Sequence, residues 1–199
     1  IMGWKKEYSL EYPNFNDCNI DMDVTVSDIL SDLSALERGQ EKNEYISENN
    51  EYLRLSGIRN EKDVLTHHIC RKHNENDIEI YKRVIKAWND HHTRIKYTDL
   101  PDKLKTHKNV TAFLDRYKVV AGDIRCSHTM IAHISKDGHY FIHPDIEQCR
   151  SISVREAARI QSFPDSYYFE GSRAAKYVQI GNAVPPLMAR GLANKIMNM

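Results

Sequence analysis

Two short stretches near the carboxyl end decide how this 199-residue chain is organised: RSISVREAARIQSFPD at 150–165 and QIGNAVPP at 179–186. In the first stretch, Ser153 and Glu156 have the spacing of a capping box. The serine hydroxyl accepts from the Glu156 N–H, and the glutamate carboxylate accepts from the Ser153 N–H. A short helix is therefore expected to begin after Ser153. Pro164 ends it, because a proline drives the preceding residue toward extended geometry.

The second stretch predicts a closing helix. Proline is well tolerated in a first helical turn, so we expect this helix to run from about Pro185 to Ile196. Gly181, Asn182 and Ala183 are placed at its start. Backbone N–H groups are free at such a position, which makes it a ready contact for a ligand. A plain helix-entry turn is the alternative interpretation of the same three residues.

Working outward, the segment CSHTMIAHISKDGHYFIH at 126–143 predicts a β-hairpin. Two apolar–polar runs flank Lys136-Asp137-Gly138, and Asp-Gly is a strong signal for a tight turn. Residues 77–88 predict a helix, because Ile78, Tyr81, Val84, Ile85 and Trp88 recur at spacings of three and four. Lysines and arginines on its opposite face indicate a solvated surface.

Closer to the amino end, residues 24–33 predict an extended lead-in or short strand followed by a helix. Ser27 is the expected cap, with Ile29, Leu30 and Leu33 on the inner face. Residues 34–60 are polar and are expected to be mostly loop.

Charge alone identifies no partner, because 28 basic and 28 acidic residues cancel. Their distribution is uneven. Residues 1–66 carry 14 acidic and 7 basic side chains, whereas residues 150–199 carry 3 acidic and 7 basic ones. This asymmetry is compatible with a nucleic-acid face in the second half. A solvated surface without a partner is the simpler explanation of charge taken by itself.

The four cysteines, Cys18, Cys70, Cys126 and Cys149, are scattered and lack CxxC spacing. Such usage is typical of free thiols in an intracellular protein. No stretch approaches the length of a membrane span, and no signal peptide is evident. We therefore expect an intracellular, cytoplasmic location.

The histidines predict no metal site. HHICRKH contains His67, His68, Cys70 and His73, but this spacing fits no familiar zinc pattern, and a second ligand pair is not evident. The adjacent His91 and His92 are no more persuasive. A basic run follows, whose members either track phosphate or form a solvated loop: Lys103, Lys105, His107 and Lys108.

Residues 150–165 closely resemble motif IX of the DNA cytosine-5 methyltransferases, and residues 179–186 closely resemble motif X. The two occur in the family's order and at about its usual separation. Weaker matches lie upstream. Residues 127–144 look like the segment that leads into motif IX, residues 24–33 like the stretch after motif VIII, and residues 1–6 like the tail of motif VIII itself.

The resemblance implies an α+β fold. A small target recognition lobe would be joined to terminal elements of a Rossmann-like, S-adenosylmethionine-dependent methyltransferase domain. Residues 1–33 would end the catalytic domain and lead in. Residues 34–149 would form the target recognition domain. Residues 150–199 would carry motifs IX and X, with a C-terminal helix that returns to the catalytic domain.

Several motifs of that family are absent from the printed sequence. There is no glycine-rich loop for S-adenosylmethionine, no Glu-Asn-Val, no Gln-x-Arg-x-Arg and no Pro-Cys nucleophile. The cysteines follow Asp17, Ile69, Arg125 and Gln148 instead. In the family, that nucleophile adds to a cytosine flipped out of the duplex, and the ring then takes the methyl group. We therefore expect no catalytic residue in this chain and no activity from it alone.

The resemblance also assigns roles to individual residues. Gly181, Asn182 and Ala183 would contact S-adenosylmethionine. Thr129 and Arg125 would contact DNA, with a strand-surface threonine as the alternative for Thr129. On the motif IX helix, three polar residues would brace the recognition domain, or else be ordinary surface residues: Arg155, Glu156 and Gln161.

The resulting hypothesis is the DNA-binding part of a methyltransferase from a restriction–modification system. Its partners would be duplex DNA with a flipped cytosine and a catalytic part, on the same chain or on a separate subunit. A first residue, Ile1, in mid-strand favours a fragment. The alternative is a free-standing DNA-binding or regulatory module, which has no need of Gly181-Asn182 and whose last helix should pack on its own core. Histidine spacing gives poor support to a metal-dependent nuclease.

Overall fold

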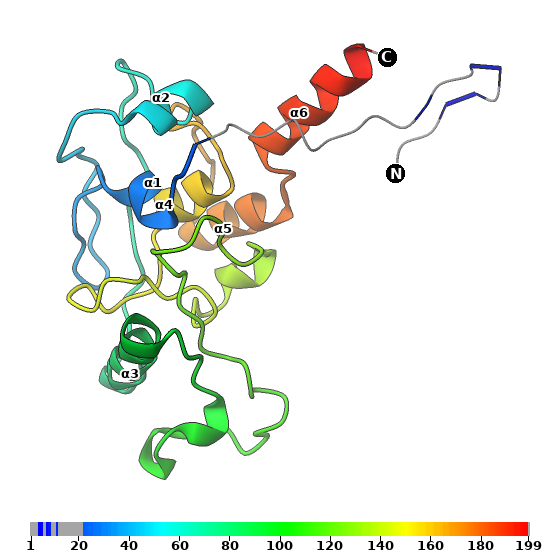
Figure 1. Ribbon diagram of the computed structural model, residues 1–199. Coiled ribbons are helices and arrows are strands. Elements are labelled where there is room, and N and C mark those ends of the chain that lie inside the picture. The colour runs from blue at the N-terminus through cyan, green and yellow to red at the C-terminus, as the bar shows by residue number, and fades with distance from the viewer. Residues whose placement is uncertain (1–3, 6, 9–10, 12–21, 199) are drawn as a thin grey trace.

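The structure is a computed structural model that describes residues 4, 5, 7, 8, 11 and 22–198 (Figure 1). The mid-strand position expected for Ile1 lies outside the described residues. Across the described part, the regular elements are helical: α1 (Val26–Leu30), α2 (Glu51–Ser56), α3 (Glu75–His91), α4 (Val154–Ile160), α5 (Arg173–Asn182) and α6 (Pro186–Met197), with 3₁₀ turns η1 (Tyr97–Asp99), η2 (Asp102–Leu104) and η3 (Ala132–Ser135).

The expectation of an α+β lobe with several strands is wrong for the described residues. In them, extended pairing is limited to isolated bridges: Leu33 with Tyr45, Glu41 with Ile69, Val119 with Ile142, and Ile142 with Ser151. Long irregular segments connect the helices, and side chains rather than a sheet ladder hold these segments in place.

The predicted hairpin at 126–143 is also wrong. Gly138 does turn the chain, with φ of +76°. The arm before it forms the η3 turn, and Ile142 in the arm after it exchanges hydrogen bonds with the 118–120 segment, at 2.8 Å from Ile142 N to Lys118 O and 2.8 Å from Val120 N to Ile142 O. The turn at Gly138 forms as predicted, but packing of η3 against α5 keeps the two arms from pairing as a hairpin.

Three helix predictions are confirmed. α4 begins at the Ser153–Glu156 capping box. α3 extends beyond the predicted residues at both ends and buries Ile78, Tyr81, Val84 and Ile85, while Trp88 is only half-buried. α6 begins at the predicted proline pair.

Other details at the helix ends differ from the predictions. Thr25, not Ser27, caps α1, because the Thr25 hydroxyl accepts from the Asp28 N–H. The sequence patterns did not predict two helices: α2, which is capped by Asn50, and α5, which is capped by Ser172. Gly181 and Asn182 end α5 rather than begin α6, and the Ala183 N–H donates to Ile180 O at 3.3 Å. The expectation of free N–H groups at a helix start is therefore wrong for these residues.

The buried apolar residues form two clusters. The larger one lies among α1, α4, α5 and η3 and includes Val26, Phe141, Ile152 and Tyr177. The smaller one joins α3 to the 97–119 segment. Figure 1 shows α3 and its neighbouring turns as a separate layer below α4 and α5. Within the described residues, no helix is both long and apolar enough to cross a membrane.

Gly181 fixes how closely α5 approaches η3. A Cβ at this position would overlap the backbone of Ile131 and Ala132. Main-chain atoms yield less readily than side chains, so only glycine permits this contact. The interface between α5 and η3 thus depends on a missing side chain.

Gly181→Ala is expected to lower the free energy of unfolding by about 1–3 kcal/mol, because overpacking against backbone forces the two elements apart. Asn182→Ala is the matched control, since Asn182 is the exposed neighbouring residue. Its effect should stay within about 0.5 kcal/mol. Urea unfolding of both variants checks this, and equal midpoints for Gly181→Ala and wild type would contradict the packing argument.

Candidate functional site at the α4 helix

α4 is a helix of buried charges. Arg155, Glu156 and Arg159 are 0%, 2% and 1% exposed, and the preceding Arg150 is 0% exposed. Burying an ion is costly unless it is paired and hydrogen-bonded. Gln161 is also buried. The alternative that Arg155, Glu156 and Gln161 are ordinary surface residues is therefore wrong.

Arg159 links the residues just after α1 to the loop after α4. Its Nη1 pairs with Asp32 Oδ1, and its Nη2 lies 2.6 Å from Asp165 Oδ2. Burial alone would lower the pKa of Arg159, but the hydrogen bonds that it donates to the two carboxylates outweigh burial and raise the pKa. Arg59 adds a second cation at 2.5 Å from Asp32 Oδ2. Two arginines and two aspartates thus form one compensated cluster.

Arg150 and Glu156 form a second pair. Both guanidinium Nη atoms lie 2.7 Å from the Glu156 carboxylate oxygens, which is a bidentate arrangement. The same carboxylate accepts from the Ser153 N–H at 2.6 Å and completes the capping box. Burial opposes ionisation, but Arg150 holds the pKa of Glu156 far below its usual range. The cap therefore stays ionised in the interior.

Two buried histidines complete this network in neutral form. His143 Nδ1 accepts from the Asp145 N–H at 3.1 Å, so its proton sits on Nε2, 3.5 Å from Glu156 Oε1. His68 Nε2 lies 2.7 Å from Ser34 O, which can only accept, so Nδ1 accepts from the Ser153 hydroxyl at 2.9 Å. Burial lowers the pKa of both rings, and that of His143 falls to about 4.

Arg155 donates its hydrogen bonds to neutral oxygens, and its Nη1 also lies 3.7 Å from Asp165 Oδ1 as an ion pair. It donates to Thr66 O at 2.9 Å, to Pro164 O at 3.1 Å and to Tyr167 O at 3.0 Å. These bonds hold the 164–167 loop against the 59–66 segment. Arg155 and Arg159 together make α4 the point at which the 29–32, 59–66 and 164–167 segments meet.

The structure brings part of the predicted cofactor and DNA residues together. Thr129 is exposed and lies two residues before Ile131, whose backbone contacts Gly181. Asn182 is exposed at the end of α5, and Gly181 and Ala183 are half-buried. Arg125 is exposed, and its Nη2 donates to Met22 O at 2.8 Å beside the entrance to α1.

The histidine-rich segment has separate partners for each side chain. His67 Nε2 accepts from the Phe169 N–H, Cys70 Sγ donates to Glu37 O, and His73 Nε2 contacts Ser151 Oγ. His68 is held as described above. In residues 22–198, no group of three or more candidate ligands is placed to hold a metal ion.

The thiols that the structure describes differ in environment. Cys70 and Cys149 are buried and donate to backbone carbonyls, and burial raises the pKa of both. A thiol nucleophile requires the opposite, a lowered pKa in an accessible position. Cys126 is exposed. Cys18 lies outside the described residues.

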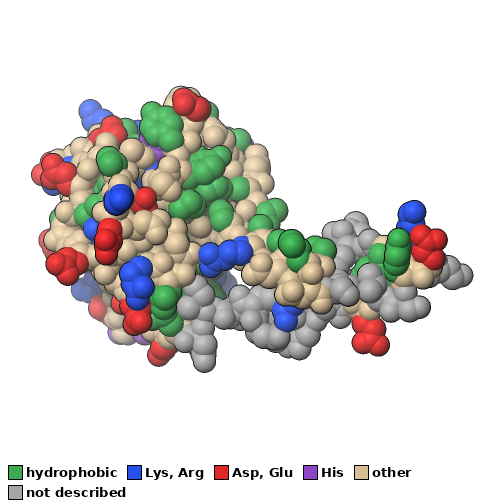
Figure 2. All heavy atoms as spheres, turned by 90° about the horizontal axis from the view of Figure 1, so that it is seen from above, with side chains coloured by type: hydrophobic (Ala, Val, Ile, Leu, Met, Phe, Trp, Pro, Cys, Tyr) green, Lys and Arg blue, Asp and Glu red, His purple; other side chains and the backbone are tan. Residues whose placement is uncertain are grey.

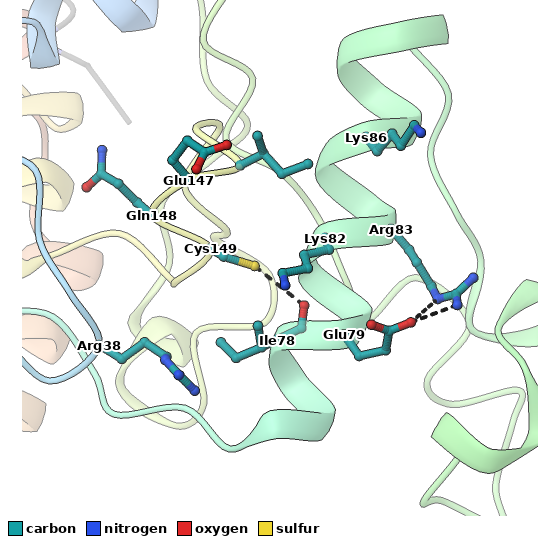
Figure 3. Close-up of a pocket in the computed structure, with 10 residues that line it drawn as sticks. Arg38, Ile78, Glu79, Lys82, Arg83, Lys86, Glu147, Gln148 and Cys149 are labelled. Atoms are coloured by element: carbon teal, nitrogen blue, oxygen red, sulfur yellow. Dashed lines mark hydrogen bonds and ion pairs between the residues drawn. The ribbon is translucent and has the colours of Figure 1, made fainter.

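A hollow of about 540 Å³ beside α3 was not predicted (Figure 3). Lys82 and Lys86 line it from one face of α3, and Arg38 lines it from the 34–40 segment. Lys82 and Lys86 are four residues apart and so lie on the same face of a helix, which was the sequence signal available for this hollow. None of the residues predicted to bind cofactor or DNA lines this hollow. Glu156 lines a second one, of about 600 Å³, beside Leu30 and Asn89.

A family model described as C-5 cytosine-specific DNA methylase matches residues 1–198. The chain belongs to this methylase family. The resemblance of residues 150–165 and 179–186 to the family's motifs is thereby confirmed at the level of the family. The deeply buried charge network of α4 therefore belongs to a methylase chain.

Relatives of this methylase chain include bacterial and plant proteins. Type II methyltransferase M.Bpa9945I from Bacillus paralicheniformis is 46% identical over 214 residues, which cover 100% of the chain and 46% of the relative. Type II methyltransferase M.AgeI from Thalassovita gelatinovora is 46% identical over 96 residues, covering 48% and 22%. DNA (cytosine-5)-methyltransferase 3 from Arabidopsis thaliana is 34% identical over 187 residues, covering 87% and 12%. The chain spans less than half the length of each.

One solved structure supports the fold. It is a DNA modification methyltransferase encoded within a prophage, from E. coli, with a TM-score of 0.50 and 20% identity. The match covers 87% of this methylase chain and 47% of that one. At this identity the likeness concerns the fold alone.

The buried histidines predict that the methylase chain loses stability in acid. Above pH 6.5, folded and unfolded histidines are both neutral. Between pH 6.5 and about 4, His143 is protonated in the unfolded chain but stays neutral in the folded chain. The free energy of unfolding therefore decreases as the pH is lowered through this range. The loss from one such ring is about 3 kcal/mol.

Urea unfolding at pH 7.5 and pH 4.5 measures this change. His143→Asn should reduce the difference between the two pH values. His91→Asn, at an exposed position, is the control and should leave it unchanged. An equal pH difference in wild type and His143→Asn would contradict the assignment.

Proposed function

We propose that this chain is the target recognition domain, with motifs IX and X, of a DNA (cytosine-5-)-methyltransferase. The whole enzyme would transfer a methyl group from S-adenosylmethionine to C5 of a cytosine flipped out of duplex DNA. This chain would hold the DNA, read the target sequence and close one edge of the cofactor pocket. The names of the type II relatives favour a role in a restriction–modification system.

The observation that carries this proposal is the state of α6. None of its residues is buried. Met188 is 58% exposed, Ile196 51% and Met197 85%, and Val184 just before the helix is 59% exposed. Figure 1 shows α6 pointing away from the body, and Figure 2 shows hydrophobic side chains uncovered where the chain projects. A helix that exposes several large apolar side chains is typical of an interaction site.

This exposure favours part of a larger enzyme over a free-standing module. A module that acts alone gains stability by packing its last helix on its own core, at roughly 25 cal/mol for each Å² of apolar surface buried. α6 does not do so. The proposed partner is the catalytic lobe, which would cover the apolar residues of α6.

The positions of Thr129 and Gly181 support a shared DNA and cofactor edge. Their segments are in contact through Ile131, Ala132 and Gly181. A hydroxyl at Thr129 suits a phosphate oxygen, because a neutral donor fixes position without reading sequence. The exposed Asn182 amide, at the end of α5, can bond to polar groups of a ligand.

These residues fit one edge of a site for S-adenosylmethionine. Gly181, Asn182 and Ala183 would contact the cofactor, which supplies the methyl group when bound. The remaining walls, including the glycine-rich loop, would come from the catalytic lobe. No residue of this chain is assigned to the covalent steps, since none of its cysteines follows a proline and both Cys70 and Cys149 are buried with a raised pKa.

A methylation assay tests the proposal. The chain is mixed with labelled S-adenosylmethionine and cytosine-containing duplex DNA, first alone and then with a polypeptide that carries the Pro-Cys and glycine-rich motifs. Label is expected in DNA only from the mixture. Substituting the Pro-Cys cysteine by serine in the added polypeptide is the control and should abolish labelling.

Two outcomes of this assay would overturn the proposal. Labelling by the chain alone would place a nucleophile among residues that we have excluded. An inactive mixture, together with DNA binding by the chain alone, would favour the free-standing module.

A further inference from the structure

The end of α4 has an unusual residue at its turn. Ser162 has φ of +60°, in the left-handed region that favours glycine. The Ser162 N–H donates to Arg159 O at 2.8 Å, and the Phe163 N–H donates to Ala158 O at 2.9 Å. This pair of bonds is a Schellman motif, whose left-handed position is usually glycine. A serine here needs a reason that outweighs backbone strain.

The Ser162 hydroxyl supplies that reason. Its Oγ accepts from the Leu187 N–H at 3.1 Å. α6 has no side-chain cap of its own, because Pro185 occupies the cap position, and Pro186 has no N–H to offer. A cap normally serves the N–H of the second or third helical residue, and Leu187 is the second. Ser162 therefore caps α6 from the end of another helix.

The adjacent residue holds the other side of the same corner. Gln161 is buried, and its Nε2 donates to Ile180 O at 3.1 Å in the last turn of α5. The Ala183 N–H donates to the same carbonyl. Residues 183–185 thus run between two fixed points, one set by the Gln161 amide and the other by the Ser162 hydroxyl.

We propose that Gln161 and Ser162 are positioning residues that set the corner between α5 and α6, and so place Asn182 and Ala183 for the cofactor. This inference rests on the function proposed above. It gives α4 a second role, because the helix that fixes the recognition segments also fixes the cofactor edge. A shift of α4 would therefore move both edges together.

The first arm of the test measures amide hydrogen exchange in the whole chain and needs no activity. Ser162→Ala keeps the strained backbone and removes the hydroxyl, whereas Ser162→Gly removes both. Both variants should speed exchange of the Leu187 amide by roughly five- to tenfold, the effect of one lost hydrogen bond. Ser166→Ala, in the exposed part of the same loop, is the matched control and should leave this rate unchanged.

The second arm measures methylation by the complex of the chain with the catalytic polypeptide. Ser162→Gly and Gln161→Met should raise the KM for S-adenosylmethionine by roughly five- to tenfold with little change in kcat, because a binding contact is misplaced. Ser166→Ala should leave both constants unchanged.

The two arms separate failure of the inference from failure of the proposed function. Unchanged exchange at Leu187 in both Ser162 variants would overturn the capping role. Faster exchange with a KM within twofold of wild type would overturn the cofactor-positioning role. If the wild-type mixture is inactive, the proposed function fails, and exchange at Leu187 still decides whether Ser162 caps α6.

Discussion

The structure depends on the pairing of three buried arginines around α4. Arg150, Arg155 and Arg159 are each no more than 1% exposed, and an unpaired ion at such depth would cost several kcal/mol. Their partners are Glu156, Asp32 and Asp165, with the carbonyls of Thr66, Pro164 and Tyr167. Because these partners lie on the 29–32, 59–66 and 164–167 segments as well as on α4 itself, satisfying the arginines also fixes where those segments lie. In the described residues, this network of ion pairs and hydrogen bonds holds the irregular segments together, as a β-sheet does in many folds.

The same helix links the two edges of the proposed site. Its body holds the 29–32, 59–66 and 164–167 segments, of which 59–66 falls in the proposed target recognition domain. Its end holds the corner between α5 and α6 through Gln161 and Ser162. Gly181 then brings α5 against the segment that leads from Thr129. The proposed DNA and cofactor edges would therefore both be positioned by α4. Such an arrangement suits a reaction that requires a flipped base and a methyl donor to meet at a fixed distance.

Sequence patterns that span a few residues correctly predicted the helices whose start or inner face depends on neighbouring residues. The Ser153–Glu156 spacing located α4, the proline pair located α6, and apolar periodicity located α3. The hairpin at 126–143 failed because Ile131 and Ala132 dock on Gly181, a contact fifty residues away in sequence that no local pattern encodes. Burial of Arg155 and the capping role of Ser162 were missed for the same reason. Both follow from partners that only the folded chain brings near.

The exposed apolar residues of α6 are the proposed docking surface for the catalytic lobe, and their role in association can be measured. Calorimetric titration of the chain with the catalytic polypeptide should show one-to-one association with a negative heat-capacity change, as expected when apolar surface is buried. The double variant Met188→Asp and Ile196→Asp should abolish or strongly weaken it. Asn194→Asp, which adds one negative charge at an exposed position of the same helix, should have little effect. No association, or equal binding by the double variant, would contradict the claim that α6 docks on the catalytic lobe.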